Sequence, residues 1–299
     1  VVVSTPHNLH REPTVAALRR GLHVLLEKPL ATSVTDAQAI LRAVNQLDRV
    51  VMMGVNRRGD PSWRAIQQTL ATNEIGRVRQ ISAVIGSDAR LIRQEMRWHP
   101  NVQRWIESSA ISRVFAADIF KPGSWRSDPV QMGGDMFTDI GAHLVDVLLW
   151  MAGAPAAEIL AYAPKNRPTG AAILTVQALL TNDVILSITF NDNVAFGDEF
   201  NFQTRGRITA YGDEGMLTVD MPHFPPGPAG EIRLEKNGVP QAVTVEGVPI
   251  SPAAAFVACV LDGAPNIAPV EDAVNVVALN QGAYRSAAEG CIVRMNEDV

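Results

Sequence analysis

The first 58 residues alternate between short apolar runs and helical patterns, and this alternation limits the fold more than any other feature. Two helical patterns separate three aliphatic runs, which fall at residues 1–3, 22–26 and 49–55. The second pattern opens with Ser33-x-x-Asp36, the signature of a helix-capping box. Strand, helix, strand, helix, strand at this spacing is typical of parallel βαβ units. The sequence therefore predicts a parallel sheet flanked by helices.

Polar residues follow each of the three predicted strands. Because the carboxyl ends of parallel strands share one edge of the sheet, ligands of open α/β sheets bind outside that edge. Three segments converge there, namely Ser4-Thr5-Pro6, Glu27-Lys28-Pro29 and Asn56-Arg57-Arg58. Lys28 alone would be an ordinary surface lysine at a strand end. Its position on this shared edge predicts that it faces a ligand cleft.

Beyond about Gly76 the pattern changes to that of antiparallel strands. Residues 173–180 and 184–190 alternate in polarity and are joined by Thr181-Asn182-Asp183, which indicates a hairpin. Further strand patterns are "GRITAYG", "GMLTVD", "EIRLEK" and "QAVTVEG". We therefore expect an α/β plus α+β chain: residues 1–58 in a truncated Rossmann-type parallel sheet, and residues 59–299 in a domain with a large, mainly antiparallel open sheet. Helical spacing returns at residues 252–288, and these helices are expected to pack back on the first domain.

Composition narrows the classes of partner. The chain has 299 residues, of which 47% are hydrophobic, and a net charge of −5, which is typical of a soluble globular protein without a nucleic-acid or anionic-membrane surface. No apolar run approaches the ~20 residues that span a bilayer. Cys259 and Cys291 form no C-x-x-C pair and no disulfide framework, which fits a reducing compartment. A small molecule is the expected ligand, and the cytoplasm the expected location, although an upstream targeting segment is not excluded.

Residues 124–153 carry the clearest chemistry. Gly133 and Gly134 precede a helix predicted to begin near residue 138, and they permit close approach of a ligand or another backbone. At 100° per residue, Asp139, His143 and Asp146 fall on one narrow stripe of that helix. A carboxylate one turn before a histidine can fix the tautomer of the imidazole and raise its basicity, as a general base requires.

Two other interpretations of this stripe stay open. Taken alone, an Asp-His-Asp stripe on an amphipathic helix is more often a solvated face or a local hydrogen bond. It could also be half of a metal site, but no partner motif such as H-E-x-x-H is present, so no metal is expected. His10 and Trp125 are likewise unremarkable when each is taken singly.

Taken together, these segments resemble one family. "STPHNLHREPTVAALRRGLHVLLEKPLA" is similar to the T-P-x-x-x-H and A-L-x-x-G-x-H-V-x-x-E-K-P-x-A signature of the Gfo/Idh/MocA oxidoreductases, which include glucose–fructose oxidoreductase and inositol dehydrogenase. "WRSDPVQMGGDMFTDIGAHLVDVLLWMAG" resembles the same family's segment in which paired glycines precede a D-x-G-x-H-x-x-D helix. The two motifs occur in the expected order, and the resemblance spans essentially the whole chain.

The resemblance implies hydride transfer between NAD or NADP and a sugar, polyol or related hydroxylated substrate. It gives Lys28 a hydrogen bond to the reacting oxygen, His143 the role of proton acceptor and Asp139 that of orienting His143. The cofactor-binding positions that it implies are Ser4, Thr5, Pro6, His10, Glu27, Lys28, Pro29, Asn56, Arg58, Trp125 and Arg126.

One departure from the family stands out. The family opens with a G-x-G-x-x-G turn that cradles the pyrophosphate, and this sequence has none. The sequence therefore predicts a fragment that lacks about two βαβ units and the residue that selects NAD or NADP. We expect the chain as given to bind dinucleotide poorly or not at all, which calorimetry would test.

Two alternative functions share this fold. A glycosidase that oxidises its substrate transiently with bound NAD would keep the lysine but release no reduced cofactor. A non-catalytic dinucleotide-binding sensor would not need Lys28, Asp139 and His143 together. The family also implies a homo-oligomer, a dimer or a tetramer, and the sequence does not identify the substrate.

Overall fold

The computed structural model describes residues 1–88, 107, 124–167, 170–194, 204–221 and 228–295. Within these residues the chain forms two sheets, one of three strands in the order β1-β2-β3 and one of nine in the order β11-β10-β9-β8-β4-β7-β6-β5-β12. Apart from Asp88 and Glu107, the stretch 88–121, whose role the sequence left unassigned, lies outside the described residues.

The small sheet is parallel and follows the predicted βαβ pattern. Its strands and connecting helices are β1 (Val2–Val3), α1 (Arg11–Arg19), β2 (Val24–Leu26), α2 (Val34–Leu47) and β3 (Val51–Met53). The predicted capping box is confirmed, since the Ser33 hydroxyl accepts a hydrogen bond from the backbone N–H of Asp36. Gly21 follows α1 with φ +75°, a left-handed conformation that ends helices and that glycine adopts without strain.

The large sheet is mainly antiparallel, as predicted. Its strands are β4 (Val78–Ser87), β5 (Ala156–Tyr162), β6 (Ile173–Leu180), β7 (Ile185–Asn191), β8 (Thr204–Gly212), β9 (Gly215–Met221), β10 (Ile232–Lys236), β11 (Val239–Gln241) and β12 (Val293–Arg294). The predicted hairpin is β6–β7. One pair, β4 with β7, is parallel.

One predicted strand is wrong. The pattern "QAVTVEG" indicated a strand over residues 241–247, but β11 ends at Gln241 and residues 242–247 run on without strand pairing. Val243 packs half-buried against the core, but Val245 is 48% exposed, so the segment lacks the continuous buried face of a strand. Alternation predicts a strand only where a neighbouring strand and a core are available to it.

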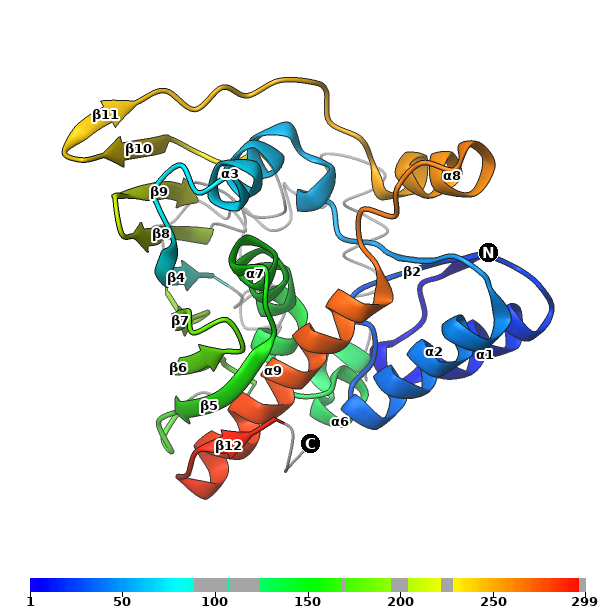
Figure 1. Ribbon diagram of the computed structural model, residues 1–299. Helices are drawn as coiled ribbons and strands as arrows, with labels where there is room; N and C mark the ends of the chain where they lie inside the picture. Colours follow the sequence, from blue (N-terminus) through cyan, green and yellow to red (C-terminus); the bar gives the residue numbers. More distant parts are fainter. Residues whose placement is uncertain (89–106, 108–123, 168–169, 195–203, 222–227, 296–299) are drawn as a thin grey trace.

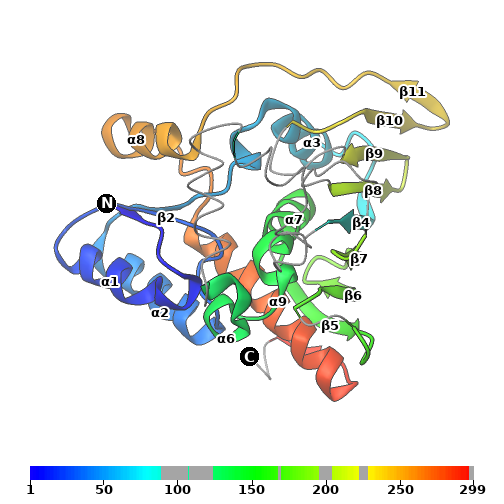
Figure 2. The same cartoon turned by 180° about the vertical axis from the view of Figure 1, so that it is seen from behind.

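Two long helices, α7 (Met136–Ala152) and α9 (Val270–Glu289), lie between the two sheets (Figures 1 and 2). The shorter helical elements are η1 (His7–Leu9), η2 (Arg57–Gly59), α3 (Pro61–Ala71), η3 (Trp125–Ser127), α6 (Pro129–Met132) and α8 (Pro252–Asp262). None of the helices in the described part of the chain has the length and apolar character that crossing a bilayer requires.

The core has two parts that meet at α9. Some side chains of α9, such as Ala273 and Val277, pack with β1–β3, α1 and α2. Another, including Leu279 and Ala283, joins α7 and the large sheet. The helix α9 therefore packs against both the first sheet and the large sheet. This arrangement holds the carboxyl ends of the parallel strands against the beginning of α7.

Candidate active site

Lys28 and Asp139 are joined across 111 positions of sequence. Lys28 lies two residues after the end of β2, and Asp139 lies in the first turn of α7. The lysine ammonium donates a hydrogen bond to the backbone carbonyl of Asp139 over 3.0 Å and forms an ion pair with the carboxylate of the same residue. The Asp139 side chain is 4% exposed, whereas that of Lys28 is 17% exposed and so reaches solvent.

The second oxygen of Asp139 binds Arg126. Arg126 donates from Nη1 over 2.7 Å, and its guanidinium lies 4.3 Å from the ring centre of Trp125. Burial alone would raise the pKa of Asp139, but the positive charges of Lys28 and Arg126 hold it well below the usual value. Asp139 is therefore an ionised carboxylate that fixes two cations.

His143 lies one helical turn after Asp139 and is 8% exposed. Burial lowers the pKa of its imidazole well below 6.5, and the nearby charges of Lys28 and Arg57 lower it further, against the weaker opposing effect of Asp139. His143 is consequently a neutral imidazole at physiological pH. A neutral ring has one unprotonated nitrogen, as a proton acceptor requires.

The stripe of acids and histidine on α7 is buried throughout. Asp139, His143 and Asp146 are 3%, 8% and 5% exposed, so the solvated-face interpretation is wrong. The stripe is buried because other parts of the chain cover it. The end of β2 and the helix η2 lie over this side of α7, and they supply Lys28 to Asp139 and Arg58 to Asp146. In the described residues no group of three or more His, Cys, Asp or Glu side chains could hold a metal ion.

Four of the predicted cofactor residues lie on the open edge formed by the strand ends. Ser4, Thr5, Glu27 and Asn56 are exposed there. The carboxylate of Glu27 lies against Gly54, where a Cβ would come within 3.2 Å of it. These hydroxyl, carboxylate and amide groups are of the kind that bind ribose hydroxyls and carboxamides, so the edge fits a dinucleotide chemically.

His10 joins two of the strand-end segments. Its ring nitrogens lie 2.8 Å from the carbonyl oxygen of Pro29 and 3.0 Å from that of Thr5. Pro6 is half-buried, and Pro29 is buried behind Lys28. His10 is itself fully buried, so its observed contacts position the backbone of this edge.

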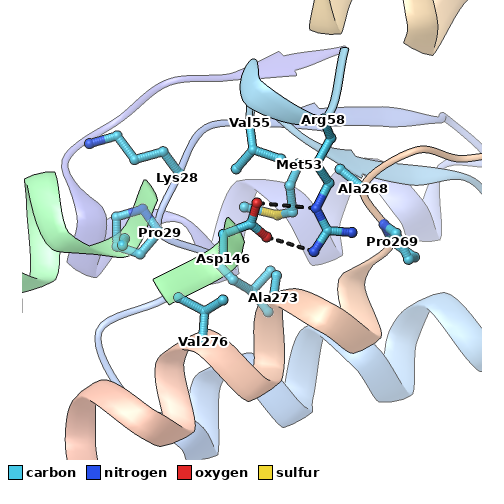
Figure 3. Close-up of a pocket in the computed structure, with 12 residues that line it drawn as sticks. Lys28, Pro29, Met53, Val55, Arg58, Asp146, Ala268, Pro269, Ala273 and Val276 are labelled. Carbon is cyan, nitrogen blue, oxygen red and sulfur yellow. Dashed lines mark hydrogen bonds and ion pairs between the residues drawn. The ribbon is translucent and has the colours of Figure 1, made fainter. Parts of the chain in front are cut away.

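Arg58 is placed differently from the other predicted cofactor residues. Two nitrogens of its guanidinium donate to the two oxygens of Asp146, over 3.1 and 2.7 Å (Figure 3). A third nitrogen donates to Asp272 over 2.5 Å. The side chain is 2% exposed and also lies over the ring of Trp150. The structure thus brings Arg58 between α7 and α9 rather than to the exposed edge.

Lys28 and Pro29 also line a small pocket with Arg58 and Asp146 (Figure 3). In that view the ammonium of Lys28 points away from the Arg58–Asp146 pair. The charge of Lys28 also lowers the pKa of the His143 imidazole.

The paired glycines let the start of α7 approach two other segments. Gly133, at φ +84°, would place a Cβ 2.7 Å from Thr32, and Gly134, at φ +143°, would place one 2.7 Å from the ring of Tyr284. The hydroxyl of Tyr284 donates to the helix-capping Asp135 over 2.6 Å. Here the close approach that the glycines permit is to neighbouring side chains of the same chain.

Two residues of this region were given no individual role from the sequence: His7, and Arg57, which was named only within the strand-end segment Asn56-Arg57-Arg58. The His7 ring lies edge-on to Trp125 at 4.4 Å, and its Nδ1 is 3.0 Å from the carbonyl oxygen of Met132. Arg57 donates to the carbonyl oxygen of His143 over 2.9 Å. Both adjoin predicted residues in the sequence, His7 after Pro6 and Arg57 before Arg58, and that adjacency was the only available signal.

Two models of one protein family match most of this chain. The first, described as an oxidoreductase family with an NAD-binding Rossmann fold, matches residues 1–97. The second, described as the GFO/IDH/MocA C-terminal domain, matches residues 104–218. The chain belongs to the Gfo/Idh/MocA oxidoreductase family. The predicted resemblance and fold class are thereby confirmed.

Individual relatives within the Gfo/Idh/MocA family agree with this assignment. The 1,5-anhydro-D-fructose reductase of Ensifer adhaerens is 31% identical over 163 residues, which cover 54% of this chain and 40% of that relative. The inositol 2-dehydrogenase of Leifsonia xyli is 26% identical over 202 residues, covering 66% of this chain and 49% of that relative. The chain thus aligns with less than half the length of each.

A solved structure shows the same fold over nearly all of the chain. The aldose-aldose oxidoreductase of Caulobacter crescentus superposes with a TM-score of 0.74 at 21% identity, covering 98% of this chain and 78% of that one. At this identity the similarity concerns the fold.

Proposed function

We propose that this chain supplies the catalytic part of an NAD(P)-dependent oxidoreductase that acts on a hydroxylated, sugar-like substrate. The observation that carries the proposal is the contact of Lys28 with Asp139 one helical turn from the neutral, buried His143. If the Lys28–Asp139 ion pair only stabilised the fold, it would not need the unprotonated imidazole of His143 beside it. Family membership supports the same class of chemistry.

The three side chains divide the proton chemistry among them. Lys28 donates to the reacting oxygen, because an ammonium has three donors and stabilises the negative charge that develops there. Asp139 holds Lys28 in place through its carboxylate and carbonyl oxygens. We therefore give Asp139 the role of orienting the lysine, in addition to the orientation of His143 that the sequence suggested.

His143 accepts the proton of the substrate hydroxyl on its unprotonated ring nitrogen. The C–H bond of the carbinol breaks at the same carbon, and its electron pair leaves with the hydrogen as hydride. Nicotinamide, when bound, accepts that hydride. In the reverse direction the imidazolium returns the proton to the oxygen, so the same residues serve a reductase.

The residues that would hold the nicotinamide end of the cofactor lie on the open strand edge. Ser4, Thr5, Glu27 and Asn56 offer exposed polar groups, and His10 fixes the backbone that carries them. Trp125 and Arg126 close the side next to Asp139. Arg58 would act on the site through α7, since it binds Asp146 there.

We also propose a homo-oligomer formed through the open face of the large sheet. Val84, Ile185, Tyr211 and Met216 are 58%, 48%, 43% and 37% exposed on its strands. Such apolar surface favours association of copies.

Cys259 and Cys291 form no disulfide, which supports a cytoplasmic location.

The test of the proposed function is formation of reduced nicotinamide, followed by absorbance, across a panel of polyols, sugars and sugar acids. Two forms are assayed: residues 1–299 alone, and the same chain with a G-x-G-x-x-G βαβ segment placed before Val1. We expect a substrate-dependent rise in absorbance with the second form. If neither form reduces NAD or NADP with any member of the panel, and neither oxidises the reduced cofactors with the corresponding ketones, the proposal is refuted.

A further inference from the structure

Arg57 is a buried cation that the proposed reaction does not use. It is 4% exposed and lies on η2 directly before Arg58. One nitrogen donates to the carbonyl oxygen of His143 over 2.9 Å, and the guanidinium carbon is 5.5 Å from the ring centre of Trp63. Among the residues that the structure describes, no carboxylate forms an ion pair with Arg57.

Asp146, the acid that attracts Arg57, and Asp139 of the candidate active site are already bound by other cations. Both oxygens of Asp146 accept from Arg58, and both oxygens of Asp139 accept from Lys28 or Arg126. Asp146 still attracts Arg57 over a longer distance, but burial dominates and lowers the pKa of Arg57 to about 10. Arg57 therefore stays charged at neutral pH.

A buried charge without a direct partner is costly to the folded chain. Removing a guanidinium from water carries a large desolvation penalty, which an opposite charge at hydrogen-bonding distance offsets. The group has five N–H donors in a planar fork, and the carbonyl of His143 uses one of them. That fork matches a carboxylate, which it binds through two parallel hydrogen bonds.

We infer that Arg57 binds a carboxylate of the substrate, and that the substrate is therefore a sugar acid or a related hydroxylated acid. The inference rests on the proposed function, since it takes His143 as the residue that faces the reacting hydroxyl. Arg57 is hydrogen-bonded to the backbone of that same residue, so a bound carboxylate would lie on the His143 side of the site. A neutral polyol would leave the guanidinium without a counter-charge.

The test compares acids and neutral sugars that differ at one group. The chain is titrated calorimetrically with three matched pairs, D-glucuronate and D-glucose, D-galacturonate and D-galactose, and D-gluconate and D-glucitol. We expect at least one acid to bind at least tenfold more tightly than its neutral counterpart. Binding is measured independently of any turnover.

Three variants identify the side chain responsible. Arg57→Met keeps the volume and removes the charge, and should reduce the preference for that acid by 10- to 100-fold. Arg57→Lys keeps the charge without the fork and should retain part of the preference. Arg42→Met removes an arginine from the exposed face of α2 and should change nothing.

The outcomes separate this inference from the proposed function. Equal binding of acid and neutral sugar in all three pairs refutes the carboxylate site, whether or not hydride transfer occurs. So does an unchanged preference in both Arg57 variants. A preference that depends on Arg57, with no reduced nicotinamide formed from any substrate, supports the carboxylate site and refutes the oxidoreductase. Far-ultraviolet circular dichroism establishes that each variant is folded before it is titrated.

Discussion

Acidification should destabilise this chain through His7, and the Asn variant at that position should remove the effect. His7 is 3% exposed, and burial lowers its pKa to about 3, against the attraction of Asp139. In the unfolded chain the pKa of the imidazole returns to about 6.5. Below that pH the unfolded state binds a proton that the folded state does not, so stability falls as pH falls.

The magnitude follows from the two pKa values. The free energy of unfolding begins to fall as pH drops below about 6.5 and keeps falling down to about pH 3, by about 1.4 kcal/mol for each pH unit. Between about pH 7 and about pH 5, His7 alone should therefore lower the free energy of unfolding by about 2 kcal/mol. This is a large share of the stability of an ordinary domain.

The assay is urea unfolding of the chain and of His7→Asn at both pH values. The Asn amide replaces Nδ1 as a donor to the carbonyl of Met132 and carries no titratable group. We expect the variant to lose about 2 kcal/mol less than the wild type on acidification. An identical pH dependence in the two proteins would show that His7 is not held neutral by burial, and would refute the reasoning.

Three further predictions concern the packing and charge around α7. Gly134→Ala should lower the free energy of unfolding by about 1–3 kcal/mol, because its Cβ would lie 2.7 Å from Tyr284; a melting temperature equal to the wild type contradicts this. Asp146→Ala should cost about 3 kcal/mol in urea unfolding, since Arg58 would keep only Asp272 as an ion-pair partner; a loss below about 1 kcal/mol would mean that the pair contributes little. Because burial lowers the pKa of His143, the rate of substrate oxidation should stay constant as pH falls through 6.5, the usual imidazole value, and a half-maximal rate at that pH would contradict a buried neutral base.

Elements of both sheets could be predicted where their signals are local. The capping box at Ser33 and the hairpin between β6 and β7 each depend on residues close together in the sequence. The failed strand at residues 241–247 shows the limit of such signals. Its alternation was present, but residues 242–247 pair with no neighbouring strand.

The candidate site could be predicted as a set of positions but not as a set of contacts. Periodicity placed Asp139 and His143 on one stripe of a helix, yet it could not show whether solvent or protein covered that stripe. Adjacent arginines at one strand end were indistinguishable in the sequence. Arg58 differs from Arg57 only because its partners, Asp146 and Asp272, lie 88 and 214 positions away. Such pairings depend on tertiary structure alone.

The central claim is that the ammonium of Lys28 and the imidazole of His143 serve one reaction. The most direct test is the rate of nicotinamide reduction in a single turnover by Lys28→Met and His143→Asn, with the G-x-G-x-x-G segment in place and a substrate that the wild type accepts. The account predicts that each substitution slows hydride transfer by at least 100-fold, consistent with the loss of a general base or of an oxyanion donor. Rates within threefold of the wild type in both variants would contradict it.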